Sequence, residues 1–200
     1  MKRYVVAIVA VLAVTACSPD AVPVPKKSDV DVDTPALVKR KSTAGIGACV
    51  PGSGSPVEGG LPELTLPCLG GGPDVDLATL RGPMVVSLWA QWCGPCRDEM
   101  PILQQFHETY GDQVSVVGID YLDTQPDSAL ALMDETGATY PSLADPGGDL
   151  SAQEPFPALR GLPYLAFVAA DGTVASVRPG QVDSQQELVG LVEQHLGLTL

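Results

Sequence analysis

Residues 84–96 read MVVSLWAQWCGPC and contain the pattern on which the fold prediction rests. The first seven positions are apolar or β-branched apart from one serine, which is typical of a strand buried on both faces of a parallel sheet. Cys93 and Cys96 follow, separated by a glycine and Pro95. A proline in the first turn of a helix lacks only an N–H that would have no partner. The stretch therefore predicts a buried strand that leads into a helix, with both cysteines at the junction.

Two cysteines at such a junction form a small redox loop. The unpaired N–H groups and the dipole at a helix N-terminus favour a thiolate, so Cys93 is the expected nucleophile. Cys96, one turn further in, is then the residue that resolves a mixed disulfide. A zinc half-site and an inert disulfide are the alternatives. Zinc would need two more ligands, and the only histidines are His107 and His195, both expected on exposed helix surfaces.

On both sides of residues 84–96, the chain alternates between helix-like and strand-like patterns. The helix that starts at the cysteines is expected to continue to Tyr110, with a kink at Pro101. Residues 145–160 are rich in proline and glycine and are expected to be mostly loop. The remaining expected elements are strands at 64–66, 113–120, 140–143, 164–169 and 173–177, and helices at 124–137 and 184–196. This order predicts an α/β fold with a mixed sheet and right-handed crossovers.

The N-terminus has the layout of a secretory signal. Lys2 and Arg3 precede an apolar run over residues 4–14 that is too short to span a bilayer comfortably. The run ends in VTAC, where small residues before Cys17 resemble the bacterial lipobox. We expect residues 1–16 to be a signal peptide and Cys17 to be lipidated, because two or three acyl chains anchor a protein stably. The alternative is an ordinary signal peptide with an incidental cysteine.

Export changes the interpretation of the other cysteines. With Cys17 lipidated, four of the five cysteines remain in an oxidising compartment, and four cysteines allow three pairings. Only one pairing joins Cys93 to Cys96, and it leaves Cys49 with Cys68. We favour a structural disulfide between Cys49 and Cys68, and a second, relay redox pair is the alternative.

Residues 17–60 have the composition of a lipid-anchored flexible linker, and the folded domain is expected over residues 61–200. The stretch contains several prolines, clustered charges and a Gly/Ser-rich segment. A calcium-binding loop is not favoured for the DVDVD run, residues 29–33, because the glycine and the glutamate that such a loop has at later positions are missing. Eleven basic residues against 24 acidic ones give a net charge of −13, which argues against nucleic-acid binding.

Three stretches, WAQWCGPCRDEMP (89–101), LPELTLPCLGGGPDVDLATLRG (61–82) and GLPYLAFVAADGTV (161–174), together resemble the TlpA/ResA branch of membrane-tethered thioredoxin-like proteins. The resemblance covers roughly residues 61–200, and its WCGPC core is highly specific for the thioredoxin superfamily. It implies a thioredoxin-like, three-layer α/β fold in which helices flank a central mixed sheet. It also implies that Pro163 is a cis-proline facing the disulfide and that Leu162 donates backbone hydrogen bonds to a bound peptide. Trp92 is expected to form an exposed flank of that groove.

Proton transfer is expected to depend on Glu99. Cytosolic thioredoxins carry a buried aspartate where this chain has Ser87, whereas the ResA-like branch has a glutamate three residues after the second cysteine. Glu99 holds that position and shares a helix face with Cys96. A partly buried carboxylate with a raised pKa would accept the proton of Cys96. A solvated first-turn acid is the alternative interpretation of Glu99.

The resemblance implies an exported enzyme that reduces or exchanges protein disulfides without a cofactor or a bound metal. Its partners would be substrate proteins with disulfides or thiol pairs, such as an apocytochrome c, and a membrane thiol transporter as electron donor. One alternative is a peroxiredoxin-like peroxidase, which expects Thr or Ser three residues before the nucleophile, where this chain has Ala90. A copper-delivery module is another, but it would need a Cys-x-x-x-Cys spacing.

Overall fold

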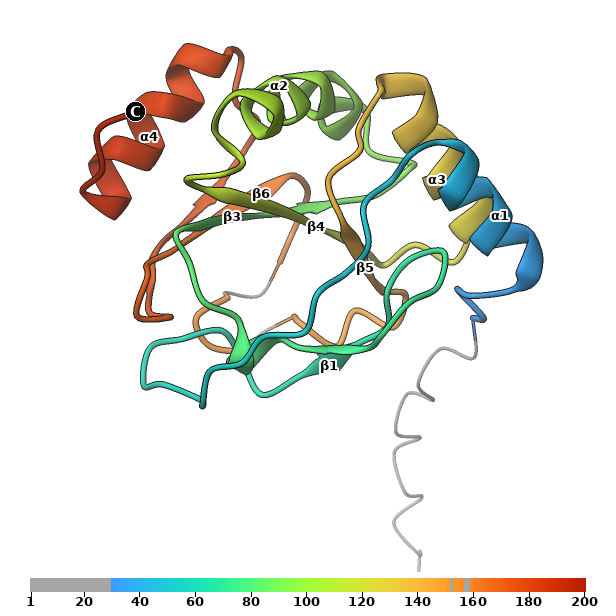
Figure 1. Ribbon diagram of the computed structural model, residues 1–200, viewed down its shortest axis with the longest axis horizontal. Helices are drawn as coiled ribbons and strands as arrows, with labels where there is room; N and C mark the ends of the chain where they lie inside the picture. The colour runs from blue at the N-terminus through green and yellow to red at the C-terminus, as the bar shows by residue number, and fades with distance from the viewer. Residues whose placement is uncertain (1–29, 152, 157–158) are drawn as a thin grey trace, which may run out of the picture.

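A computed structural model describes residues 30–151, 153–156 and 159–200, and its centre is a five-stranded mixed sheet (Figure 1). The strand order is β5-β4-β3-β6-β7. The strands are β3 (Met84–Trp89), β4 (Ser115–Tyr121), β5 (Ser142–Asp145), β6 (Tyr164–Val168) and β7 (Val174–Pro179). β3, β4 and β5 run parallel to one another, and β6 and β7 are added antiparallel. The predicted α/β fold with a mixed sheet is confirmed.

The described residues form four α-helices, which pack on one face of this sheet and at one of its edges. They are α1 (Pro35–Thr43), α2 (Gly94–Tyr110), α3 (Pro126–Thr136) and α4 (Gln185–Leu196). Figure 1 shows α2 and α4 above the sheet, with α3 and α1 beside each other at the edge that carries β5. Because all six residues of β3 are buried, this strand contributes to the core on both faces.

The two faces of the sheet are covered differently. Val85 and Trp89 of β3 pack in the cluster that includes α2, α3 and α4. Val86 and Leu88 point to the other cluster, which is closed by the chain around residues 49–80 and by Leu150 and Phe156. That second layer contains the short antiparallel pair β1 (Thr65–Leu66) and β2 (Val75–Asp76) and the 3-10 turn η1 (Leu77–Thr79).

The expectation of a flexible linker up to residue 60 is wrong for the part of it that the structure describes. Thr34 caps α1, and Pro35 occupies its first turn. Leu37 and Ile46 are buried in the core formed with the helices. The prolines and charges resemble linker composition, and the buried apolar residues are too widely spaced to give a periodic pattern. Residues 1–29, which include the signal peptide and Cys17, lie outside the described residues.

Cys49 and Cys68 are joined by a disulfide in the structure, with Cα atoms 5.9 Å apart. Both are buried in the layer opposite the helices. Cys68 also forms an isolated bridge with Leu143 of β5. The bond therefore fastens the segment that follows α1 to the edge of the central sheet. Within the described residues, no helix is both long enough and apolar enough to cross a membrane.

Replacing both Cys49 and Cys68 with alanine should lower the free energy of unfolding by roughly 3 kcal/mol, because a disulfide over this sequence separation of 19 restricts the unfolded chain. Urea titration under non-reducing conditions measures the difference. An unchanged urea midpoint with an unchanged m-value would show that the bond contributes nothing to stability.

Candidate active site

The Cys93–Cys96 pair lies where β3 ends and α2 begins. Cys93 is the N-cap residue of α2, and its Sγ accepts the N–H of Cys96 at 3.1 Å. The two cysteines form a disulfide. Cys93 is 5% exposed, whereas Cys96 is fully buried. When the bond is reduced, the Cys93 thiolate would retain this N–H and the favourable end of the helix dipole, so Cys93 is the sulfur suited to nucleophilic attack.

The loop before Cys93 is held by the end of β4. The N–H of Gln91 donates to Asp123 Oδ2 at 2.9 Å, and the indole Nε1 of Trp92 donates to the carbonyl of Leu122 at 3.3 Å. Asp123 is buried and also accepts the N–H of Gln125. No local pattern indicates this role of Asp123, since it requires the parallel pairing that brings the ends of β3 and β4 together.

Asp120, at the end of β4, is a buried carboxyl group close to this loop. It pairs with Trp89 in the sheet register, and its Oδ1 has no hydrogen-bond partner among the described residues. Burial, together with the neighbouring carboxylate of Asp123, raises the pKa of Asp120 well above its usual range. Burial therefore favours the neutral form of Asp120 over its charged form, while the neighbouring Asp123 accepts the backbone N–H groups of Gln91 and Gln125.

An apolar surface adjoins the cysteines. Trp92 is 53% exposed, as expected from the sequence, and Leu122 is 47% exposed with a left-handed φ of 53°. Large side chains left in water beside a reactive sulfur are suited to contact a partner chain. Leu162 is half-buried and precedes Pro163 by a cis peptide bond, the isomer expected from the resemblance. The carbonyl of Pro163 accepts the N–H of Gly180 at 2.9 Å.

Glu99 is buried, 1% exposed, on the same face of α2 as Cys96. Its Oε1 accepts the N–H of Val182 at 2.9 Å. Burial raises the pKa of Glu99 to about 7, although Val182, Arg178 and the Ser87 hydroxyl act in the opposite direction. The carboxyl group can therefore exchange a proton near neutral pH. This environment differs from the solvated first-turn acid that was the alternative.

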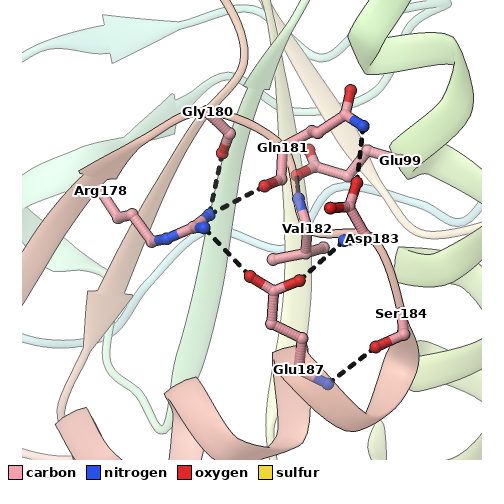
Figure 2. Close-up of polar contacts among 8 residues, drawn as sticks. All are labelled: Glu99, Arg178, Gly180, Gln181, Val182, Asp183, Ser184 and Glu187. Atoms are coloured by element: carbon pink, nitrogen blue, oxygen red, sulfur yellow. Dashed lines mark hydrogen bonds and ion pairs between the residues drawn. The ribbon is translucent and has the colours of Figure 1, made fainter.

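Figure 2 shows the polar network that holds Val182 against Glu99. Arg178 of β7 is paired with Glu187 of α4 at 3.0 Å, and it donates to the carbonyls of Gly180 and Gln181. The second carboxylate oxygen of Glu187 accepts the N–H of Asp183. These contacts fix the loop between β7 and α4. Sequence reasoning missed this network, because its members are far from the cysteines along the chain.

The structure also changes the expected placement of the histidines. His107 is half-buried and packs edge-on against Tyr140, with ring centroids 6.2 Å apart, and His195 packs on Phe167 at 4.9 Å. Neither is fully exposed. No group of three or more potential ligands in the described part of the chain is arranged to hold a metal ion.

Comparisons with protein families agree with this geometry. Residues 57–177 match the AhpC/TSA family, and residues 1–18 match the prokaryotic membrane lipoprotein lipid attachment site. The thiol:disulfide interchange protein CycY of Rhizobium leguminosarum is 32% identical over 62% of this chain and 67% of its own length. The thiol:disulfide interchange protein DsbE of Allochromatium vinosum is 30% identical over 68% of this chain and 75% of its own length.

Solved structures of DsbF proteins resemble this fold. A DsbF homologue from Corynebacterium diphtheriae superposes with a TM-score of 0.60 at 30% identity, covering 68% of this chain and 85% of that one. DsbF of Mycobacterium tuberculosis gives a TM-score of 0.59, also at 30% identity, over 69% of this chain and 98% of that one.

Glu99→Gln should leave a folded protein whose release of mixed disulfides is slower near neutral pH, because Cys96 loses its internal proton acceptor. Stopped-flow exchange with a small disulfide between pH 5 and 10 measures this. The pKa of Glu99 is higher in the folded chain than its ordinary value of 4.5, so its contribution to stability is lost as pH rises through about 7. The variant should therefore lose less stability than the parent between pH 5 and 8.

Asp98→Asn is the matched control for Glu99→Gln, since Asp98 is the exposed neighbour and its substitution removes the same charge. Its pH–rate curve should follow that of the parent. An unshifted curve for Glu99→Gln as well would assign proton transfer to another group.

Arg178→Gln and Glu187→Gln break the same ion pair but should shift the pH profile in opposite directions. Arg178 lowers the pKa of Glu99 and Glu187 raises it, so the apparent pKa of exchange should rise in the first variant and fall in the second. Each shift should be on the order of half a pH unit for partly exposed charges. Shifts of the same sign would mean that the pair acts only by holding the loop.

Proposed function

The chain belongs to the AhpC/TSA family and is a thiol–disulfide oxidoreductase of the thioredoxin-like, TlpA/ResA-like class, and we propose that Cys93 and Cys96 are its exchanging pair. The observation that carries this assignment is their disulfide at the N-terminus of α2, with Cys93 as the cap. The protein is an extracytoplasmic lipoprotein anchored to the cell membrane. Cys17, inside the matched attachment site, is the residue that would carry the lipid.

The reaction transfers two electrons in two exchange steps. The Cys93 thiolate attacks one sulfur of a substrate disulfide, which forms a mixed disulfide and releases the other substrate sulfur as a thiolate. Cys96 then gives up its proton and attacks Cys93 Sγ, which closes the Cys93–Cys96 bond and releases the second substrate thiolate. The substrate is reduced to a dithiol, and the enzyme is left with the disulfide seen in the structure.

Glu99 would take the proton of Cys96 in the second step. The two side chains are buried on one face of α2, where bulk water has little access to the thiol. A carboxylate with a pKa of about 7 is suited to receive that proton and to pass it on near neutral pH. Deprotonation would also strengthen the contact of Glu99 with the N–H of Val182.

Substrate binding would use the exposed apolar surface and the turn before β6. Trp92 would pack against the substrate chain on one side of Cys93. Leu162 would offer its backbone to an extended segment, as the resemblance implies for the residue before Pro163. The same resemblance makes an apocytochrome c a candidate substrate and a membrane thiol transporter the candidate electron donor. Both fit a protein held at the membrane.

The alternative functions are less well supported. A peroxidase of the peroxiredoxin type would need a hydroxyl group three residues before Cys93, and Ala90 at that position is buried and apolar. The two-residue spacing inside the Cys93–Cys96 loop differs from the spacing expected of a copper carrier. Relatives named thiol:disulfide interchange proteins agree with exchange chemistry.

Cys96→Ser should accumulate a mixed disulfide between Cys93 and a peptide disulfide substrate, because the resolving thiolate is missing. Non-reducing mass spectrometry would locate the adduct. Cys93→Ser is the matched control and should form little adduct on Cys96, which is fully buried. Equal trapping on either cysteine would contradict the assigned roles, and rapid consumption of hydrogen peroxide with no peptide adduct would favour the peroxidase.

A further inference from the structure

Lys41, in the last turn of α1, points its ammonium group at the second disulfide. Its Nζ lies 2.9 Å from Cys68 Sγ and 2.9 Å from the carbonyl oxygen of Gly71. The residue is only 7% exposed. An ammonium group has three N–H donors, whereas a disulfide sulfur is a weak acceptor, so the carbonyl is its single strong partner here.

This cation is buried without a compensating anion. Among the ion pairs formed by the described residues, none involves Lys41. Burial alone lowers the pKa of Lys41, and no neighbouring carboxylate acts against it. A buried, unpaired ammonium is costly. The missing anion would be supplied by a thiolate on Cys68, which forms only when the disulfide opens.

A depression of the surface lies near the bond on each side, so that a thiol would reach Cys49 after a small movement of the surrounding side chains. Cys49 lines a small hollow with Leu80, Val117 and Pro141. On the opposite side, Lys41 lines an open groove that runs past residues 70–72. The Gly72 position lacks a side chain, and a Cβ atom there would lie 3.3 Å from Cys68 Sγ. Both sulfurs are thus buried but close to the surface.

We propose that Cys49–Cys68 is a second thiol–disulfide exchange site, opened by a low-molecular-weight thiol, at which Lys41 stabilises the Cys68 thiolate that leaves. The small thiolate attacks Cys49 Sγ from the hollow, forms a mixed disulfide with Cys49 and releases Cys68 as a thiolate beside the ammonium. A second small thiolate then attacks the sulfur of the small thiol in this mixed disulfide and releases Cys49 as a thiolate. The small thiols leave as their own disulfide, and Cys49 and Cys68 have together gained two electrons.

The position of the bond gives this reaction a structural consequence. Cys49 Sγ also contacts the carbonyl of Ser142 at 3.3 Å, and Cys68 bridges to Leu143, so the pair joins the segment after α1 to β5. That segment lies between the N-terminal attachment site and the sheet. Opening the bond would release one of its covalent attachments to the domain without involving Cys93 or Cys96.

The test uses the full-length protein in detergent with Cys93→Ser and Cys96→Ser, so that exchange at the first pair cannot contribute. The protein is equilibrated with mixtures of reduced and oxidised glutathione, and alkylation followed by mass spectrometry gives the fraction of open Cys49–Cys68. We expect Lys41→Met to lower the equilibrium constant for opening of the bond by glutathione about tenfold. This corresponds to a rise of roughly one unit in the pKa of the Cys68 thiol once the ammonium is lost. Lys39→Met, an exposed lysine on the same helix, should match the parent.

An equal equilibrium constant for the parent and for Lys41→Met would overturn the proposal, and so would a parent bond that stays closed throughout the glutathione series. If Lys41→Met does not fold, the pH dependence of alkylation in the reduced parent decides. The pH dependence for Cys68 should then give a thiol pKa below the ordinary value of about 8.5, whereas that for Cys49 should give no such lowering of the pKa. The glutathione adduct should lie on Cys49, and an adduct mainly on Cys68 would contradict the assigned direction of attack.

Discussion

The carboxyl end of β3 meets the N-terminus of α2, and this junction is the constraint around which the rest of the protein is organised. β3 is the central strand, buried on both faces, so its end has a fixed position in the core. The helix that starts there presents unpaired N–H groups to Cys93. Gln91 is tied to Asp123 at the end of β4, which fixes the loop between strand and helix. Rigid elements thereby place the sulfur of Cys93 next to the exposed side chain of Trp92.

Several ionisable side chains are buried among the described residues, and three of them, Asp120, Glu99 and Lys41, are accommodated in different ways. Burial, together with the neighbouring carboxylate of Asp123, raises the pKa of Asp120 and so favours its neutral form. Glu99 lies near the midpoint of its titration at neutral pH, because one N–H and a nearby arginine offset part of the cost of burial. Lys41 has a carbonyl and a disulfide sulfur as partners. Burial that leaves a group neutral serves structure, whereas burial that leaves a group close to its titration point suits proton transfer.

The part of the fold that the sequence predicts is the part set by local patterns. The apolar run of β3 and the proline inside the Cys93–Cys96 loop each specify their own conformation over a few residues. The expected linker failed as a prediction because α1 is stabilised by contacts with α3, which no local pattern of residues 30–60 reveals. Asp123 and the Arg178–Glu187 pair were missed for the same reason. Glu99 was predicted because the ResA-like branch carries a glutamate at this position, one helical turn from Cys96.

The two disulfides show how the surroundings of a sulfur determine what the same bond can do. In both, one sulfur faces a positive electrostatic environment, supplied by the end of a helix dipole for Cys93 and by a full ammonium charge for Cys68. Cys93 lies beside an exposed apolar surface, which suits a protein partner, whereas Cys49 and Cys68 are enclosed by the chain, and Cys49 adjoins only a small hollow. The leaving thiolate sets how easily each bond opens, and access sets which thiol can open it. One domain can therefore hold two disulfides that differ in the size of the thiol able to reach them.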